Sequence, residues 1–118
     1  MASRRFITKD LLLTDSYYNL KASSKNLLTY LIVFADDDGF CDTVSTAIRQ
    51  SKSRRDTLQA LSEAGFIICF TKNLVVISNW KQMNQMPPSK YTETRYKAEK
   101  AELTVDENGI YHRKDERA

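Results

Sequence analysis

An acidic cluster stands directly before a basic segment in this sequence. Four aspartates fall within residues 36–42, and four cations but no acid follow within residues 43–55. Carboxylates bind Ca²⁺, and an EF-hand loop requires acids at positions 1, 3 and 5, glycine at 6 and glutamate at 12. Aligning Gly39 with position 6 places phenylalanine at position 1 and serine at position 12, so the cluster is not such a loop. We expect no metal site, and we interpret Asp36–Asp38 as a solvated turn that ends a helix.

The chain shows no recognisable catalytic arrangement. Its only histidine, His112, lies in the charged tail, far along the chain from Cys41 and Cys69. The two cysteines stand 28 residues apart, without the paired spacing of a zinc site, and we expect both to be reduced. The sequence contains no Ser/His/Asp set, glycine-rich phosphate loop or histidine–carboxylate motif. We therefore expect no cofactor and no enzymatic activity.

Length and composition predict one globular domain. The chain has 118 residues, of which 42% are hydrophobic and 28% charged, the balance of a protein that buries a core. No apolar run approaches the roughly 18 residues that a membrane-spanning helix needs, and the N-terminus lacks the apolar segment of a secretion signal. We expect a cytoplasmic protein with no membrane partner. The net charge of +3 permits binding to a polyanion, so the distribution of the cations matters more than their sum.

Hydrophobic periodicity predicts helices in the first half of the chain. Residues 6–20 indicate one or two short helices. The most regular helix covers residues 23–36, with Ser23 or Ser24 as its N-cap. Its apolar residues recur at the 3.6-residue period: Leu27, Leu28, Leu31, Ile32 and Ala35. This stripe must face a core.

Two shorter helices are predicted to follow. Asp42 is well placed to cap a helix that ends near residue 50. In the next helix, Ser53 and Asp56 have the spacing of a capping box, and Gly65 can close the last turn. Leu58 and Leu61, with Gly65, define the inner face of this helix. Two close helices joined by a tight turn are therefore expected between residues 42 and 65.

The apolar pattern then changes to that of a β-hairpin. Residues 66–70 and 74–78 are β-branched and aromatic runs of strand length, separated by a three-residue link in which Asn73 tolerates a positive φ. Two close helices followed by a hairpin indicate a winged helix-turn-helix, in a mainly α fold with a small antiparallel hairpin. We assign residues 1–80 to this core. Residues 81–118 are predicted to form a loop, a charged C-terminal helix and a frayed tail that packs on the core or extends from it.

The cations cluster where such a fold contacts DNA. The second helix of the pair, here about residues 54–64, can lie in the major groove, and the cations surround its N–H groups and partial positive charge. Arg55 is placed to read guanine and Gln59 adenine, whereas Asp56 and Glu63 oppose phosphate. The candidate DNA contacts are Arg49, Lys52, Ser53, Arg54, Arg55, Gln59, Lys72 and Asn73.

Each of these features has a plainer interpretation. A charge run such as residues 52–55 is often a solvated face, and Lys72 can be an edge charge that keeps the hairpin soluble. Arg4 and Arg5 form either a groove-binding arm or, in our preferred interpretation, a disordered basic terminus. The late aromatic residues are expected to pack rather than to stack on bases: Trp80, Tyr91 and Tyr96.

Four segments carry a family resemblance: "SRRFITKDLL", "ADDDGF", "LSEAGFIICF" continuing into "LVVISNWK", and "DENGIYH". In these segments, which cover most of the chain, it resembles the N-terminal winged-helix domain of phage and prophage replication initiators, the replisome organisers related to bacterial DnaD-type proteins. The resemblance implies a role in a bacterial host cell in starting phage DNA replication. Relatives often carry a further C-terminal domain, so the chain is either an N-terminal fragment of that kind or a shorter protein.

We expect a DNA-binding replication protein whose partners are double-stranded DNA and, as the resemblance implies, a helicase or its loader. One alternative is a protein-interaction module that uses its apolar helix faces or its hairpin to form a homo-oligomer or to dock a loader. Another is a transcriptional repressor, since one fold serves both roles. The target sequence, the stoichiometry and the partner stay open.

Overall fold

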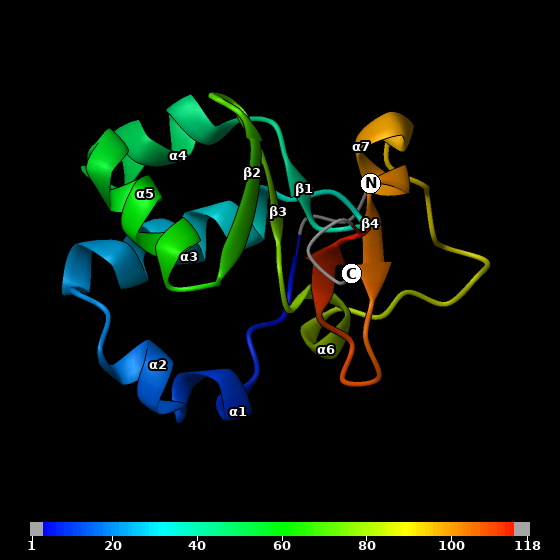
Figure 1. Ribbon diagram of the computed structural model, residues 1–118, viewed down its shortest axis with the longest axis horizontal. Coiled ribbons are helices and arrows are strands. Elements are labelled where there is room, and N and C mark those ends of the chain that lie inside the picture. Colours follow the sequence, from blue (N-terminus) through cyan, green and yellow to red (C-terminus); the bar gives the residue numbers. More distant parts are fainter. Residues whose placement is uncertain (1–3, 115–118) are drawn as a thin grey trace.

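The structure is a computed structural model that describes residues 4–114 of the chain. It is an α+β fold in which a small antiparallel sheet lies between a group of helices and a C-terminal hairpin (Figure 1). None of the helices in this range is long and apolar enough to cross a membrane. In chain order the elements are α1 (Lys9–Leu12), α2 (Asp15–Tyr18), α3 (Ala22–Phe34), β1 (Phe40–Cys41), α4 (Val44–Gln50), α5 (Arg55–Glu63), β2 (Ile67–Thr71), β3 (Leu74–Ile77), α6 (Trp80–Met83), α7 (Lys97–Ala101), β4 (Leu103–Val105) and β5 (Tyr111–Arg113).

Helix α3 is the central helix of the fold, as its apolar stripe predicted. The helix packs against α4, α5 and β1. The residues of the stripe are buried: Leu27, Leu28, Leu31, Ile32 and, just past the helix, Ala35. The predicted cap is wrong, because the helix begins at Ala22 with Lys21 in the capping position and no capping side chain. Ser24 is not the N-cap, because it lies in the first turn of the helix and is buried.

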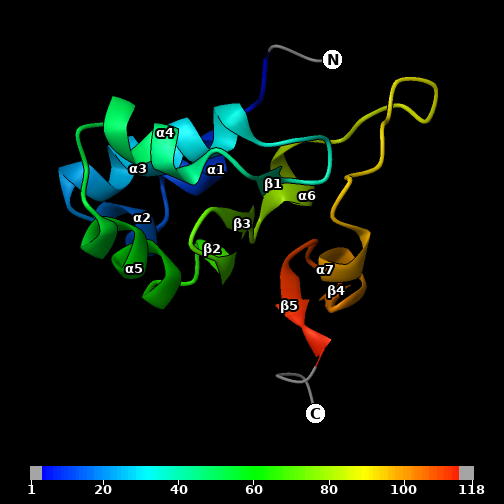
Figure 2. The ribbon, with the colours of Figure 1, turned by 90° about the horizontal axis from the view of Figure 1, so that it is seen from above.

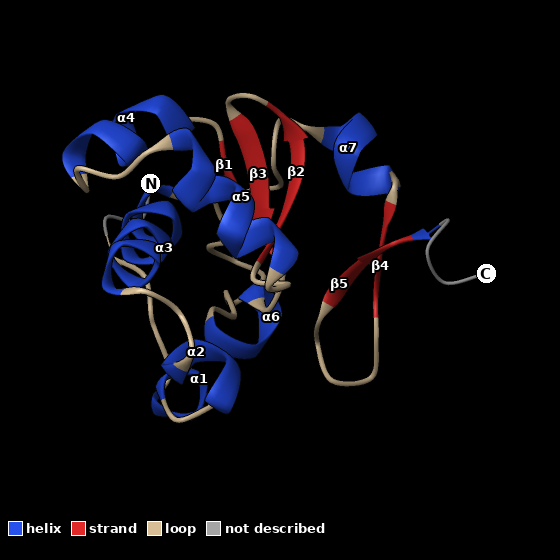
Figure 3. Ribbon diagram, turned by 60° about the vertical axis from the view of Figure 1, so that its left-hand side comes forward, coloured by secondary structure: helices blue, strands red, loops and turns tan. Residues whose placement is uncertain are grey.

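The main sheet has the strand order β1–β3–β2, with antiparallel neighbours. All four residues of β3 are buried, because α3, α4 and α5 lie on one side of the sheet and the C-terminal segment lies on the other (Figures 1, 2 and 3). Strands β2 and β3 form the predicted hairpin, but its link has two residues, Lys72 and Asn73, rather than three. Asn73, which tolerates a positive φ, does not adopt one here, and the hairpin contains a register shift between Cys69 and Thr71.

Helices α4 and α5 both end in a Schellman cap, in which the residue after the cap takes a left-handed conformation. After α5 this residue is Gly65, at φ +86°, which confirms that it closes the helix. After α4 it is Lys52, at φ 56°, the only non-glycine residue with a positive φ in the described part of the chain. The two caps share one pattern of backbone hydrogen bonds. After α5, the N–H of Gly65 donates to the carbonyl of Ser62, and the N–H of Phe66 donates to that of Leu61. After α4, the N–H of Lys52 donates to the carbonyl of Arg49, and the N–H of Ser53 donates to that of Ile48.

The start of α5 differs from the prediction. The helix begins at Arg55, and Arg54 occupies the capping position, so the predicted capping box of Ser53 and Asp56 is wrong. The hydroxyl of Thr57 accepts the N–H of Arg54 at 3.3 Å and so supplies a reciprocal bond of the kind that a capping box makes. The side chains of Arg54 and Asp56 both lie largely in solvent.

The C-terminal part is more ordered than the sequence predicted. The charged helix is confined to α7, because residues 91–96 before it form neither helix nor strand, and Thr92 and Thr94 in this segment bind the aspartates of residues 36–38. Strands β4 and β5 form a second antiparallel hairpin where a frayed end was predicted, and Leu103 and Tyr111 join the main core. The N–H of Tyr111 donates to the carbonyl of Ser78 at 2.8 Å, which ties this hairpin to the end of β3. Residues 115–118 of the predicted tail lie outside the described residues.

Candidate nucleic-acid interface

A group of exposed cations lies at the end of α4, in the turn after it and at the start of α5. We refer to Arg49, Lys52 and Arg54 as the basic corner, and all three are exposed. Among residues 4–114, only Arg54 of this group has an ion-pair partner, which is Asp56 at 3.8 Å with both side chains largely in water. Exposed pairs of this kind contribute little to stability. The basic corner therefore presents its positive charge to solvent.

Ser53, which the sequence suggested as a DNA contact, is half-buried and holds the turn in place. Its hydroxyl shares a hydrogen bond with the hydroxyl of Ser51 at 2.7 Å and reaches the carbonyl of Ser23 at 3.5 Å. The amide of Asn26, on α3, donates to the carbonyl of Ser51 at 3.0 Å. These bonds fix the turn that carries the basic corner to the central helix.

Arg55 is exposed, but its guanidinium is bound within the protein. Nη1 donates to the carbonyl of Lys72 at 2.6 Å, and Nη2 donates to the hydroxyl of Ser45 at 3.0 Å. These bonds join the start of α5 to the hairpin tip and to α4. A guanine contact through the same two N–H groups would have to break these bonds. Sequence patterns did not indicate this role, since one acceptor is a backbone carbonyl 17 residues away.

Asn73, at the hairpin tip, caps α4 from outside the helix. Its Oδ1 accepts the N–H of Ser45 at 2.9 Å, and its Nδ2 donates to the carbonyl of Asp42 at 2.5 Å. Thr43, in the capping position of α4, makes no capping bond through its side chain. The predicted Asp42 cap is wrong, because its carboxylate accepts the hydroxyl of Tyr96 at 2.6 Å. The hairpin tip and α4 therefore form one unit.

Replacing Asn73 with alanine should lower the free energy of unfolding by about 1 kcal/mol, the usual effect of removing an N-terminal helix cap. Urea denaturation followed by circular dichroism would measure the change. Lys72→Ala, at the other position of the same hairpin tip, is the matched control and should stay within about 0.5 kcal/mol of the wild type. Equal losses in the two variants would contradict the capping role.

The outward face of α5 carries polar and acidic side chains. The predicted inner face is confirmed at Leu58 and Leu61, which are buried, but Gly65 is exposed and lies beyond the helix in open space. On the outward face, Nε2 of Gln59 donates to Oε2 of Glu63 at 3.2 Å. The exposed residues of the helix are Arg55, Asp56, Gln59, Ala60 and Glu63.

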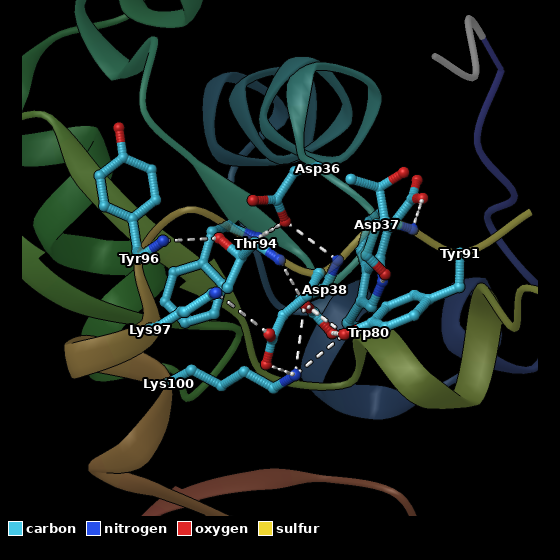
Figure 4. Close-up of polar contacts among 12 residues, drawn as sticks. Asp36, Asp37, Asp38, Trp80, Tyr91, Thr94, Tyr96, Lys97 and Lys100 are labelled. Atoms are coloured by element: carbon cyan, nitrogen blue, oxygen red, sulfur yellow. Dashed lines mark hydrogen bonds and ion pairs between the residues drawn. The ribbon is translucent and has the colours of Figure 1, made fainter. Parts of the chain in front are cut away.

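The aspartates of residues 36–38, which we term the aspartate turn, form a buried polar centre (Figure 4). Asp38 is only 1% exposed, so the predicted solvated turn is wrong. Its carboxylate accepts the hydroxyl of Tyr91 at 2.7 Å and the N–H of Thr94 at 2.8 Å, and it pairs with Lys100 at 3.4 Å. These partners lie 53 to 62 residues further along the chain, so no local pattern indicated them.

Asp37 anchors the N-terminal segment. Its Oδ1 pairs with the guanidinium of Arg5 at 2.9 Å, with both side chains nearly buried, and its Oδ2 accepts the N–H of Thr92 at 3.0 Å. The guanidinium also lies over the ring of Trp80, 5.4 Å from its centroid. The preferred interpretation of Arg5 as part of a disordered terminus is therefore wrong, whereas Arg4 is exposed. Trp80 is buried, which agrees with the predicted packing role.

Two turns of the chain share one structure and the motif Asp-x-x-Gly-apolar. In the first, Oδ1 of Asp36 accepts the N–H groups two and four residues later, both at 3.0 Å. In the second, Oδ1 of Asp106 accepts the corresponding groups at 2.9 and 3.0 Å. Gly39 and Gly109 take φ values of +89° and +81°. A β-carbon on Gly39 would lie 2.5 Å from Cγ of Trp80, so the first turn needs glycine for space as well as for conformation.

Two cations of the protein pair with the aspartate turn, Arg5 with Asp37 and Lys100 with Asp38. Burial raises the pKa of Asp36 above its ordinary value, against the effect of the hydrogen bonds it accepts. Burial alone would lower the pKa of Lys100, but hydrogen bonds to Tyr91 and Glu93 and the charge of Asp38 outweigh burial and raise this pKa.

The bonds of Arg55 and Asn73 bring together the start of α5, the start of α4 and the hairpin tip. Four exposed cations lie on these elements and on the turn between α4 and α5: Arg49, Lys52, Arg54 and Lys72. Within residues 4–114, no group of three or more His, Cys, Asp or Glu side chains is arranged to hold a metal ion. No protein-family model, curated protein or solved structure significantly matches the chain, so its function has to be argued from the site itself.

Proposed function

We propose that this protein binds double-stranded DNA as a winged helix-turn-helix, with α4 and α5 as the helix pair and the β2–β3 hairpin as the wing. The element order helix, strand, helix, helix, hairpin supports this assignment, as does the strand order β1–β3–β2. In this arrangement α5 enters the major groove and the wing lies along the neighbouring backbone. The basic corner and Lys72 then neutralise phosphates beside the groove.

One observation carries the proposal: Lys52 occupies a backbone conformation that suits glycine. Its φ is 56°, whereas the equivalent residue after α5 is Gly65. The left-handed conformation costs a residue with a side chain about 1–2 kcal/mol. Residues in sparsely populated backbone conformations cluster at functional sites, and this one presents an exposed ammonium group between α4 and α5. We infer that the charge of Lys52 is retained for phosphate contact despite the strain.

The start of α5 adds to the positive potential of the basic corner. The first N–H groups of a helix have no partner within the helix and carry a partial positive charge, so they favour phosphate. Each phosphate that a cation neutralises releases counterions. A few such contacts therefore give binding that weakens steeply as salt is added.

Replacing Lys52 with glycine tests the proposal, because stability and binding should change in opposite directions. The free energy of unfolding should rise by about 0.5 kcal/mol, since the relief of strain exceeds the entropy that glycine adds to the unfolded chain. Affinity for a duplex of about two helical turns should fall roughly tenfold at 0.1 M salt, with the salt slope reduced by about 0.9. Fluorescence anisotropy over a salt series and urea denaturation would measure both.

Two variants serve as controls for this experiment. Lys52→Arg keeps the charge and should retain duplex affinity. Gly65→Ala places a strained residue at the equivalent cap of α5, so it should lose about 1 kcal/mol of stability and keep its affinity for the duplex. Unchanged affinity in Lys52→Gly would remove this residue from the interface. A wild-type protein without salt-dependent duplex binding would refute the proposed function.

The biological role that we propose is phage DNA replication, through contact with an origin and with a helicase or its loader. This part rests on the resemblance of the motifs to replication initiators. A transcriptional repressor would use the same surface, and footprinting on the DNA around the protein's own gene would separate the two roles.

A second candidate function is that of a protein-interaction module. The observation that favours it is the exposure of large apolar side chains near the N-terminus, where Phe6 and Leu13 are 72% and Tyr18 77% exposed. Exposed apolar residues that gather in a patch mark interaction sites. This candidate differs from the first because it requires a concentration-dependent oligomer in sedimentation and only weak duplex binding.

A further inference from the structure

The outward face of α5 presents a different set of groups to DNA from the one that its sequence suggests. Arg55 is the only cation on this face, and both of its terminal nitrogens are bound, to the carbonyl of Lys72 and to the hydroxyl of Ser45. The face then offers Asp56, Gln59 and Glu63. Two of these are carboxylates, which only accept hydrogen bonds when ionised.

Gln59 is held in one orientation by Glu63. Its side-chain nitrogen lies 3.2 Å from Oε2 of Glu63. Because a carboxylate accepts and does not donate, the amide must turn its nitrogen toward Glu63 and its oxygen away. One N–H of Gln59 is then used within the helix. The remaining N–H and the carbonyl oxygen form a donor–acceptor pair on an exposed side chain.

The base edges of the major groove differ in how well they match this pair. Adenine presents an acceptor at N7 beside a donor at N6, so it can receive the free N–H of Gln59 and donate to its oxygen. Guanine presents acceptors at both N7 and O6. These atoms would face two further acceptors, the oxygen of Gln59 and the carboxylate of Glu63, and acceptors repel one another. Glu63 therefore disfavours guanine at this position, and Gln59 alone carries the positive selection.

We propose that α5 selects adenine in the major groove through Gln59, that Glu63 sets the orientation of this amide and excludes guanine, and that Arg55 positions the wing instead of reading a base. The proposal rests on the proposed function, since it names the DNA sequence feature that the same surface recognises. The basic corner supplies affinity without sequence preference, and the α5 face supplies the preference.

Selection from a randomised duplex library, followed by sequencing, tests the proposal. The wild type should enrich one adenine that Gln59→Ala does not enrich. In the selected duplex, this adenine is then replaced with purine, which lacks the N6 amino group, or with 7-deazaadenine, which lacks N7. Each replacement should weaken wild-type binding by about tenfold. Neither replacement should change the binding of Gln59→Ala, because that variant has no side-chain amide.

Glu63→Ala provides a second test, in which affinity should rise instead of fall. Removing this carboxylate should raise affinity for unselected duplex by about threefold, because less negative charge faces the phosphates. It should also reduce the preference for adenine over guanine, because the second N–H of Gln59 becomes free to donate to O6. Both side chains are exposed, so urea denaturation should show unchanged stability in both variants.

The outcomes separate this inference from the proposed function. A wild type that binds duplex in a salt-dependent manner but enriches guanine, or enriches no base that depends on Gln59, overturns the inference and leaves the proposed function standing. A Glu63→Ala variant that gains discrimination also overturns it. A wild type that shows no salt-dependent duplex binding overturns both.

Discussion

Asp38→Ala is expected to lower the free energy of unfolding by about 3 kcal/mol, the largest loss that we predict for a single polar side chain. The carboxylate is 1% exposed and holds Tyr91, Thr94 and Lys100. Without it, the buried N–H of Thr94 has no acceptor, and the segment before α7 is held to the aspartate turn only by the bond from Thr92 to Asp37. Urea denaturation at pH 7, followed by circular dichroism, would measure the change.

Two further variants make this prediction specific. Asp38→Asn keeps an acceptor for Tyr91 and Thr94 but removes the charge that pairs with Lys100, so it should lose about half as much, roughly 1.5 kcal/mol. Asp10→Ala removes an exposed aspartate of α1 and should stay within about 0.5 kcal/mol of the wild type. A loss in Asp38→Ala no larger than that of Asp10→Ala would show that the aspartate turn does not hold the C-terminal segment.

The direction in which the pKa of Lys100 is shifted determines the pH range for this measurement. Because the folded-state pKa of Lys100 is raised above its ordinary value of 10.5, its contribution to stability is complete below that value and is lost as the pH rises through the folded-state pKa. A measurement at pH 7 therefore includes the whole contribution of this contact. The difference between wild type and Asp38→Asn should shrink only in strongly alkaline solution.

Features of the fold that depend on neighbouring residues were predictable from the sequence. The stripe of α3 follows from the helical period, and the end of α5 follows from Gly65, because both are properties of one short segment. The β2–β3 hairpin was predicted for the same reason, although the length of its link was not. Local chemistry determines that a turn occurs, whereas the register of the strands also depends on how the sheet packs.

Contacts between distant segments could not be predicted in this way. A solvated turn and a buried polar centre have the same local sequence at residues 36–38, and only the partners distinguish them. Arg55 and Asn73 were both assigned to DNA, yet each makes hydrogen bonds between the hairpin tip and α4. One sequence feature did point to the C-terminal order: the motif Asp-x-x-Gly-apolar recurs at residues 106–110, where it closes the β4–β5 hairpin.

Neutralising the whole basic corner is expected to have the largest effect on DNA binding. The triple variant Arg49→Gln, Lys52→Gln, Arg54→Gln should bind duplex on the order of 10²-fold more weakly at 0.1 M salt, because three phosphate contacts no longer release counterions. The plot of log K against log salt should lose about 2.7 units of slope. The three side chains are exposed, so stability should change by less than about 1 kcal/mol in urea denaturation.

A matched triple variant decides whether position or total charge matters. Lys9, Lys90 and Lys114 are exposed and lie outside α4, α5 and the β2–β3 hairpin, and changing all three to glutamine lowers the net charge equally, from +3 to 0. This control should lose only the weak, long-range part of the attraction, which is screened beyond a Debye length of about 10 Å at 0.1 M salt. Equal losses in the two variants would mean that the protein attracts DNA through its overall charge, and the basic corner would no longer be the binding site.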